Sequence, residues 1–217
     1  MKKIHYLNLG MAKAGTSAMF DILCQHPAVD YHGYKENYGY SHHNWTLEKY
    51  IDYYKNFDVS LNFCPIQWSM EGKKIKELDS GFTHASMVFR KPMAFVHSLY
   101  AYTFQQETHT AESFIDMMLE TNQLDYTEIV KRWTSLSNRP FLMLFYDDLT
   151  SDPKMFYNQI VNFIGIDEYE FDTSKQVNVT KNEKILLVPT KTQVKKINSL
   201  VEEFENFSQR ELTHWKI

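Results

Sequence analysis

The sequence contains little cysteine, no excess of basic residues and no long apolar run, and each absence excludes a class of protein. Two cysteines in 217 residues do not make a disulfide framework, which favours a reducing compartment. Because 27 acidic residues outnumber 23 basic ones, for a formal charge of -4, no overall positive field attracts nucleic acid or anionic lipid. No apolar run approaches the roughly 18 residues that cross a membrane. We therefore expect a cytoplasmic protein without nucleic-acid or membrane partners.

The bulk composition indicates one packed domain. A hydrophobic fraction of 43% and an aromatic fraction of 15% are typical of a globular chain with a substantial core. The apolar stretch near the N-terminus is too short and too interrupted for a signal peptide, and we assign it to the first strand. Because no internal repeat, low-complexity tract or linker interrupts the sequence, we expect residues 1–217 to form a single domain.

The pattern of apolar residues predicts strands that alternate with helices. Strands are expected over residues 4–9, 59–63, 85–89 and 141–146, and the last, which is the most apolar, is expected at the centre of the sheet. Helices are expected over residues 16–25, 46–54, 92–105, 112–121, 125–136, 152–165 and 192–207. This order implies an α/β fold of three layers, in which a central, mostly parallel β-sheet is flanked by helices. Ligands of such folds bind at the carboxyl ends of the strands.

The loop after the first strand has the pattern of an anion-binding site. Residues Gly10-Met11-Ala12-Lys13-Ala14-Gly15-Thr16-Ser17 have the length of the phosphate-binding P-loop, GxxxxGK[ST]. Thr16 occupies the position where that loop requires lysine, and the lysine of this sequence stands at position 13. A strand, a loop and a helix in this order direct backbone N–H groups and the positive end of the helix at an anion, and Lys13 adds a full charge. The pattern therefore predicts an anion site.

The same loop resembles the ProLysxGlyThrThr loop of sulfotransferases, which use 3′-phosphoadenosine-5′-phosphosulfate as their donor. The resemblance implies a P-loop-like fold and a loop that holds the 5′-phosphosulfate of this cofactor. The residues that it assigns to this contact are Lys13, Ala14, Gly15, Thr16, Ser17 and Ala18.

Three later segments also resemble this family. The stretch from Arg90 through Ser98 to Tyr100 is similar to its ArgxPxxxxxSerxTyr element, which assigns Arg90 and Ser98 to the 3′-phosphate. An arginine at a strand end can direct two donors at a phosphate, and a serine two turns into the next helix offers a hydroxyl. The segment Tyr146–Leu149 resembles the family's TyrGluAspLeu segment, for which we expect a structural role. Lys181 is similar in position to a lysine of the late loop that closes over the cofactor.

Sulfuryl transfer to a hydroxyl needs a proton acceptor near the attacking oxygen and positive charge near the leaving phosphate. Lys13 can supply the charge. Lys35-Glu36 resembles the LysGlu element of glycan-type sulfotransferases, which implies that Glu36 is the base and that Lys35 belongs to the catalytic group. The cytosolic small-molecule sulfotransferases use a histidine instead, so three histidines of the same loop remain alternatives. They are His32, His42 and His43.

The acceptor is less well defined by the sequence. Residues 62–68 resemble the AspxSerPro segment with which glycan-type members contact their acceptor, but Asn62 and Cys64 stand in place of the aspartate and the serine. We expect a hydroxyl-bearing acceptor, either a glycan or another small molecule. No metal is expected, because the adjacent His42 and His43 diverge and no carboxylate or cysteine accompanies them at ligand spacing.

Two other functions fit part of the pattern. In a P-loop kinase or nucleotide hydrolase, the run Phe141–Asp147 would be the apolar strand that ends in a magnesium-binding aspartate. The threonine at position 16 argues against this reading. A nucleotide-binding or partner-binding module without activity is the other alternative, because the acceptor segment departs from the family's pattern.

Overall fold

The chain folds into two compact units. The first comprises Met1–Phe89 and Arg132–Val179, and the second comprises Arg90–Lys131 and Thr180–Ile217. The computed structural model describes residues 3–30, 35–36, 45–64, 69–102, 109–174 and 187–217. The expectation that the whole chain is one domain stays a prediction.

The first unit is built on a parallel sheet of four described strands. They are β1 (Ile4–Asn8), β2 (Val59–Phe63), β3 (His84–Phe89) and β4 (Phe141–Phe145), in the order β2-β1-β3-β4. Each neighbouring pair is parallel, and Leu7 of β1 lies opposite Asn62 on one side and Ala85 on the other. Parallel neighbours require crossover connections, which here carry the helices. The sheet confirms the predicted α/β fold.

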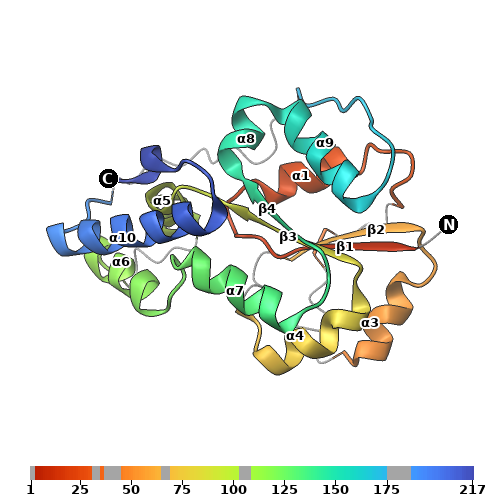
Figure 1. Cartoon of the computed structure of the whole chain (residues 1–217), viewed down its shortest axis with the longest axis horizontal. Helices are drawn as coiled ribbons and strands as arrows, with labels where there is room; N and C mark the ends of the chain where they lie inside the picture. The colour runs from red at the N-terminus through yellow and green to blue at the C-terminus, as the bar shows by residue number, and fades with distance from the viewer. Residues whose placement is uncertain (1–2, 31–34, 37–44, 65–68, 103–108, 175–186) are drawn as a thin grey trace. The chain divides into compact units, whose positions relative to one another are not determined.

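Helices cover both faces of this sheet (Figure 1). On one face lie α1 (Thr16–Leu23), α8 (Tyr146–Ser151) and α9 (Pro153–Ile164), and on the other lie α3 (Leu47–Tyr54) and α4 (Gly72–Leu78), which η2 (Asp79–Gly81) follows. Phe20 of α1 packs edge-on against Phe63 of β2, with ring centroids 5.8 Å apart. From the opposite face, the Tyr50 hydroxyl of α3 bonds to the ring of His5 in β1 at 2.9 Å. The three predicted layers are therefore confirmed.

The prediction that residues 141–146 form a central strand is wrong. Among the four described strands, β4 lies at the edge of the sheet, and β1 and β3 occupy the centre. Its first three residues are half-buried and only its last two are buried, whereas all five residues of β2, at the other edge, are buried. The hydrophobicity of a strand indicates whether its two faces are buried. It does not indicate whether the strand pairs with a neighbour on both edges, so the most apolar strand need not be central.

The described part of the second unit contains three whole helices and the first half of a fourth. They are α5 (Pro92–Tyr102), α6 (Ala111–Glu120), the first half of α7 (Tyr126–Leu136) and α10 (Lys191–Ser208), and the 3₁₀ turn η4 (Thr213–Trp215) follows them. The buried amide of Gln193 joins α10 to α6 by donating to Asp116 Oδ1 at 2.8 Å and to the Glu112 carbonyl at 3.1 Å. None of the helices described in the chain has both the length and the apolar character needed to cross a membrane.

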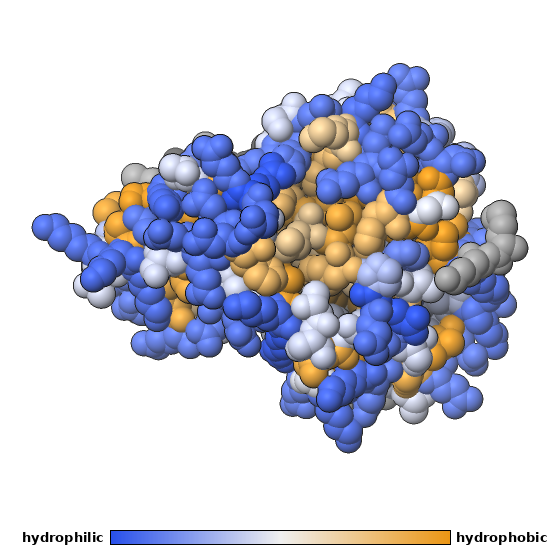
Figure 2. Space-filling view, viewed as in Figure 1, coloured by the Kyte–Doolittle hydropathy of each residue, from blue (hydrophilic) through white to orange (hydrophobic). Residues whose placement is uncertain are grey.

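α10 and η4 enclose an aromatic core. Phe204 and Trp215 stack with ring centroids 6.4 Å apart, and Tyr126 of α7 meets Phe204 edge-on at 5.4 Å. The outward surface of α10 is mostly hydrophilic, as Figure 2 shows, so the helix is amphipathic. The second unit therefore has a hydrophobic core of its own.

Removing the Trp215 side chain should strongly destabilise this core. Trp215 is fully buried, and Trp→Ala changes at such positions cost about 3–5 kcal/mol through lost burial and the cavity left behind. Val188 of the same unit is 71% exposed, so Val188→Ala is the matched control and should change stability by less than about 0.5 kcal/mol. Urea denaturation of the two variants measures the difference. Equal midpoints would contradict this description of the core.

Candidate functional site

The loop between β1 and α1 has the left-handed backbone that a compact anion cradle needs. Gly10, Lys13 and Gly15 have φ angles of 97°, 64° and 82°. Gly15 is the N-cap of α1, and no side-chain cap hydrogen bond is made to the first turn of the helix. The first N–H groups of a helix have no partner within the helix. They are available to an anion, whose charge the helix dipole favours.

The carboxyl end of β3 fixes this loop in place. The Val88 amide donates to the Gly10 carbonyl at 2.7 Å, and the Met11 amide donates to the Val88 carbonyl at 3.1 Å. Two residues earlier, the Leu9 amide donates to the Ser86 carbonyl at 2.9 Å. The pairing of β1 with β3 thus continues into the loop and sets the direction in which it leaves the sheet.

The segment Tyr146–Leu149 packs directly against the loop. A Cβ atom placed on Gly15 would lie 2.7 Å from Leu149 Cδ2 and 3.1 Å from Tyr146 Cε2. α8 therefore leaves no room for a side chain at position 15, where φ also disfavours one. This contact gives the segment the kind of structural role that we expected for it.

Lys35 and Glu36 lie beside the loop. The Lys35 carbonyl accepts a hydrogen bond from the Phe63 amide at 2.9 Å, which holds the residue at the carboxyl end of β2. Its Nζ donates to Ser17 Oγ at 2.9 Å and lies 2.5 Å from Glu36 Oε1. The side chains of Lys35 and Glu36 are 21% and 28% exposed, so solvent or a substrate can reach both. The first unit thus brings the predicted base, Lys35 and the predicted anion loop together.

Arg90 and Ser98 belong to the second unit. Arg90 is the first residue after β3, and its carbonyl accepts a hydrogen bond from the Tyr126 hydroxyl at 2.9 Å. Burial raises the pKa of Tyr126 far above its ordinary value, and the charge of Arg90 lowers it by a smaller amount. The hydroxyl is therefore neutral and can donate. Ser98 is half-buried in α5, two turns after Pro92. The helix thus begins at Pro92 as the sequence predicts, whereas its predicted end near residue 105 lies outside the described residues.

The remaining candidates divide into two groups. Lys181 and the alternative bases His32, His42 and His43 lie outside the described residues. Asn62 is fully buried and donates to the Tyr50 hydroxyl at 3.0 Å, and Cys64 is also fully buried, so both side chains pack inside the first unit. In the described part of the chain, no group of three or more His, Cys, Asp or Glu side chains is arranged to hold a metal ion.

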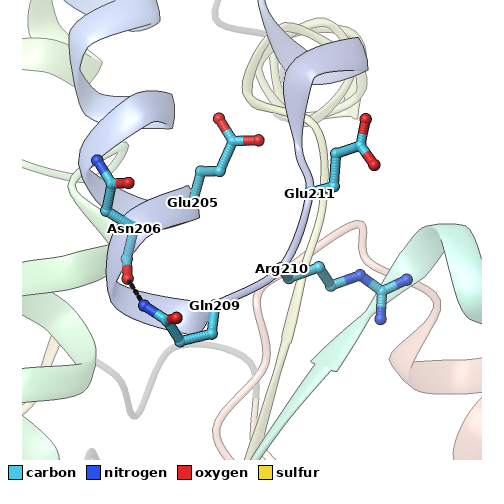
Figure 3. A pocket seen from close by; sticks show the side chains of 5 residues that line it. All are labelled: Glu205, Asn206, Gln209, Arg210 and Glu211. Atoms are coloured by element: carbon cyan, nitrogen blue, oxygen red, sulfur yellow. Dashed lines mark hydrogen bonds between the residues drawn. The ribbon is translucent and has the colours of Figure 1, made fainter.

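A polar pocket at the end of α10 has a structural explanation (Figure 3). The residues that line it are Glu205, Asn206, Gln209, Arg210 and Glu211. The Glu205 carboxylate accepts a hydrogen bond from the Leu212 amide at 2.8 Å and lies 3.7 Å from Lys216 Nζ. The Leu212 amide is the main reason that the pKa of Glu205 is lowered, and Lys216 adds to the effect. Glu205 thus ties the segment after α10 back to the helix.

Comparisons with known proteins give one matching family model and several solved structures of similar fold. The model of the sulfotransferase domain matches residues 3–216. A solved sulfotransferase from Alicyclobacillus acidocaldarius has a TM-score of 0.72 at 16% identity, with 100% of both chains covered. The sulfotransferase domain of the Synechococcus PCC 7002 olefin synthase has a TM-score of 0.58 at 15% identity, covering 94% of this chain and 96% of that one. The sulfotransferase domain of the curacin biosynthetic pathway has a TM-score of 0.61 at 13% identity, covering 98% and 99%. No curated protein matches the sequence.

Replacing Gly15 by alanine should destabilise the protein more than replacing Gly165. Both glycines have positive φ, 82° and 77°, and each substitution costs about 1–2 kcal/mol of backbone strain. Only the new methyl at position 15 meets other side chains, since a Cβ at position 165 has nothing within 4 Å. Overpacking adds about 1–3 kcal/mol. Urea denaturation of Gly15→Ala and Gly165→Ala measures the difference, and equal losses would show that α8 does not confine the loop.

Proposed function

The chain belongs to the sulfotransferase family, and on this premise we propose that it transfers the sulfuryl group of 3′-phosphoadenosine-5′-phosphosulfate to a hydroxyl group of an acceptor. Sulfuryl transfer itself follows from the family. The donor, the acceptor and the residues that act on them are the content of the proposal. The observation that carries it is the pair of contacts of Lys35 Nζ, at 2.9 Å to Ser17 Oγ and 2.5 Å to Glu36 Oε1. These contacts join an anion loop to a carboxylate, as the reaction requires.

The residues of the loop fit a donor that ends in a phosphosulfate. The positive φ angles of Lys13 and Gly15 turn the backbone, and the first turn of α1 offers N–H groups with no side-chain cap in front of them. We assign the phosphosulfate to Lys13, Ala14, Gly15, Thr16, Ser17 and Ala18. We assign the 3′-phosphate to Arg90 and Ser98, and we keep Lys181 as a further cofactor contact.

The donor supplies an activated sulfuryl group whose leaving group is 3′-phosphoadenosine-5′-phosphate. Glu36 takes the proton of the acceptor hydroxyl while the hydroxyl oxygen forms a bond to sulfur. The bond between sulfur and the bridging phosphate oxygen breaks, and Lys13 together with the loop N–H groups stabilises the charge left on that oxygen. Lys35 orients Glu36 by the ion pair and holds Ser17 by the hydrogen bond. No step needs a metal ion.

The kinase alternative has the length of the loop in its favour but not its lysine. It requires a lysine at position 16, and Thr16 is buried there with 5% exposure. Asp147, which would be its magnesium ligand, belongs to the helix that packs against Gly15. We extend the proposal to a cytoplasmic enzyme whose acceptor is a glycan or another hydroxyl-bearing small molecule.

Replacing Lys13 or Arg90 by alanine should weaken binding of 3′-phosphoadenosine-5′-phosphate by about 10- to 100-fold, because each side chain gives a phosphate charged hydrogen bonds worth about 1.5–3 kcal/mol. Isothermal titration calorimetry measures this affinity and compares it with that for ATP and magnesium, which should bind more weakly. Lys91→Ala is the control beside Arg90, since Lys91 Nζ donates to the His214 carbonyl at 2.8 Å. Unchanged affinity in Lys13→Ala and Arg90→Ala, or preference for ATP, would refute the proposed donor.

Glu36→Gln should lower the turnover number by about 100- to 10,000-fold while leaving donor affinity within about threefold, because loss of a general base slows only the chemical step. Transfer of labelled sulfate to a panel of glycans, phenols and peptides measures turnover. Asp52→Asn is the matched control, since Asp52 forms an exposed ion pair with Lys55 at 3.2 Å. Full turnover in Glu36→Gln would transfer the role of base to one of the histidines of the loop, and alanine variants of His32, His42 and His43 would identify it.

A further inference from the structure

Asn8, the last residue of β1, is a buried polar residue to which the proposed reaction assigns no role. Its side chain is fully buried, as are those of Tyr6 and Ser86. Only Leu9 separates it from Gly10, the first residue of the loop. A fully buried amide must satisfy its hydrogen bonds within the fold, so its partners reveal what it holds.

The side chain of Asn8 joins the loop to β3. The Gly10 amide donates to Asn8 Oδ1 at 3.1 Å, and Asn8 Nδ2 donates to Ser86 Oγ at 2.8 Å. The orientation of the amide follows from chemistry, because the Gly10 N–H can only donate and must face an oxygen. The Asn8 carbonyl also accepts a hydrogen bond from the Cys64 amide at 2.9 Å, which ties the same residue to the end of β2.

Ser86 is itself held from a second side. The Tyr6 hydroxyl hydrogen-bonds to Ser86 Oγ, and burial raises the pKa of Tyr6 to about 12, so it is a neutral phenol at physiological pH. The Ser86 hydroxyl can therefore accept from Asn8 Nδ2 and donate to the Tyr6 oxygen at the same time. The amide of Asn8 has one orientation that satisfies this network, and in that orientation Oδ1 points at the loop.

The contact to Gly10 controls the conformation in which the loop begins. Gly10 is buried and has a φ of 97°, and its carbonyl is held by the Val88 amide. Without Asn8 Oδ1 its N–H would be buried without an acceptor, at a cost of about 1–3 kcal/mol. Turning the peptide toward another acceptor would relieve that cost, but it would move Lys13 and the N–H groups that follow it.

We infer that Asn8 is a positioning residue for the donor, which orients residues 10–15 so that they bind the 5′-phosphate group. The inference rests on the proposed function, because it assumes that this loop binds that group. Asn8 acts through Gly10 and does not touch the donor. An amide suits the position because it offers one donor and one acceptor without a charge, whereas a carboxylate would place a negative charge beneath an anion site.

A pair of nucleotides that differ only in the 5′-phosphate tests this role. Adenosine 3′,5′-bisphosphate carries the group that the loop binds, and adenosine 3′-monophosphate lacks it. The ratio of their dissociation constants therefore reports the contribution of the loop alone. General destabilisation of the protein changes both constants together and leaves the ratio unchanged, so the ratio separates positioning from a merely structural role.

Asn8→Ala should reduce this ratio by about tenfold, because the loop loses the hydrogen bond that sets its orientation. Asn8→Leu keeps the approximate volume of the side chain but offers no acceptor to the Gly10 N–H, so it is the variant expected to fold if the cavity left by Asn8→Ala prevents folding. It should reduce the ratio by a similar factor. Ser60→Ala is the matched control, since it removes another buried hydroxyl of the same sheet, which bonds to the ring of His5 and not to Asn8, and it should change the ratio by less than about threefold.

The outcomes distinguish the inference from the proposed function. If the wild-type protein binds both nucleotides equally, the loop does not bind the 5′-phosphate and the proposed function is refuted together with the inference. If the wild-type protein discriminates and the folded Asn8 variants discriminate equally well, the proposed function stands and the role of Asn8 is refuted. A reduced ratio in the Asn8 variants, with Ser60→Ala close to wild type, supports both.

Discussion

The site depends on the attachment of a short backbone loop to the end of the neighbouring strand. The loop has few side chains of its own, and what it offers an anion is mainly N–H groups, whose directions are set by the path of the backbone. Val88 of β3 holds that path through two hydrogen bonds, and α8 closes it from the other side by filling the space over Gly15. A backbone anion site must be rigid before the ligand arrives, because its donors cannot reorient as side chains do. The parallel sheet supplies this rigidity, since the ends of β1, β2 and β3 meet at one edge.

The positive charge that an anionic donor needs must be local in this protein. A chain with a formal charge of -4 binds an anionic donor only if positive potential is concentrated where the donor lies. In the proposed site, Lys13, Lys35 and the start of α1 provide this concentration at the loop. Glu36 is an acidic side chain beside these positive groups, and Lys35 Nζ forms an ion pair with its Oε1 at 2.5 Å. The lysine thereby keeps a carboxylate close to an anion site, where the two negative groups would otherwise repel each other.

Much of the site could be predicted because its signals are local in the sequence. The loop was recognisable from the order of Lys13, Gly15 and Thr16 after an apolar strand, and Pro92 marked the start of α5. α4 was not predicted, because only Ile75 and Leu78 of its seven residues are buried and no periodic pattern is visible. Asn8 was also missed, because a single asparagine at a strand end has no pattern, and its role depends on Ser86, which lies 78 residues further along the chain.

The sequence by itself determined the alternation of strands and helices and the loop between the first strand and the first helix, because each of these depends on neighbours in the chain. Only the tertiary structure decided that β4 is an edge strand, that Leu149 closes over Gly15 and that Lys35 reaches Ser17. These facts depend on how distant segments pack. The hydrophobic character of a segment indicates that the segment is buried, but it does not indicate which segment it packs against. The loop that the sequence predicts to be an anion site is thus held in shape by residues that the sequence did not connect with it.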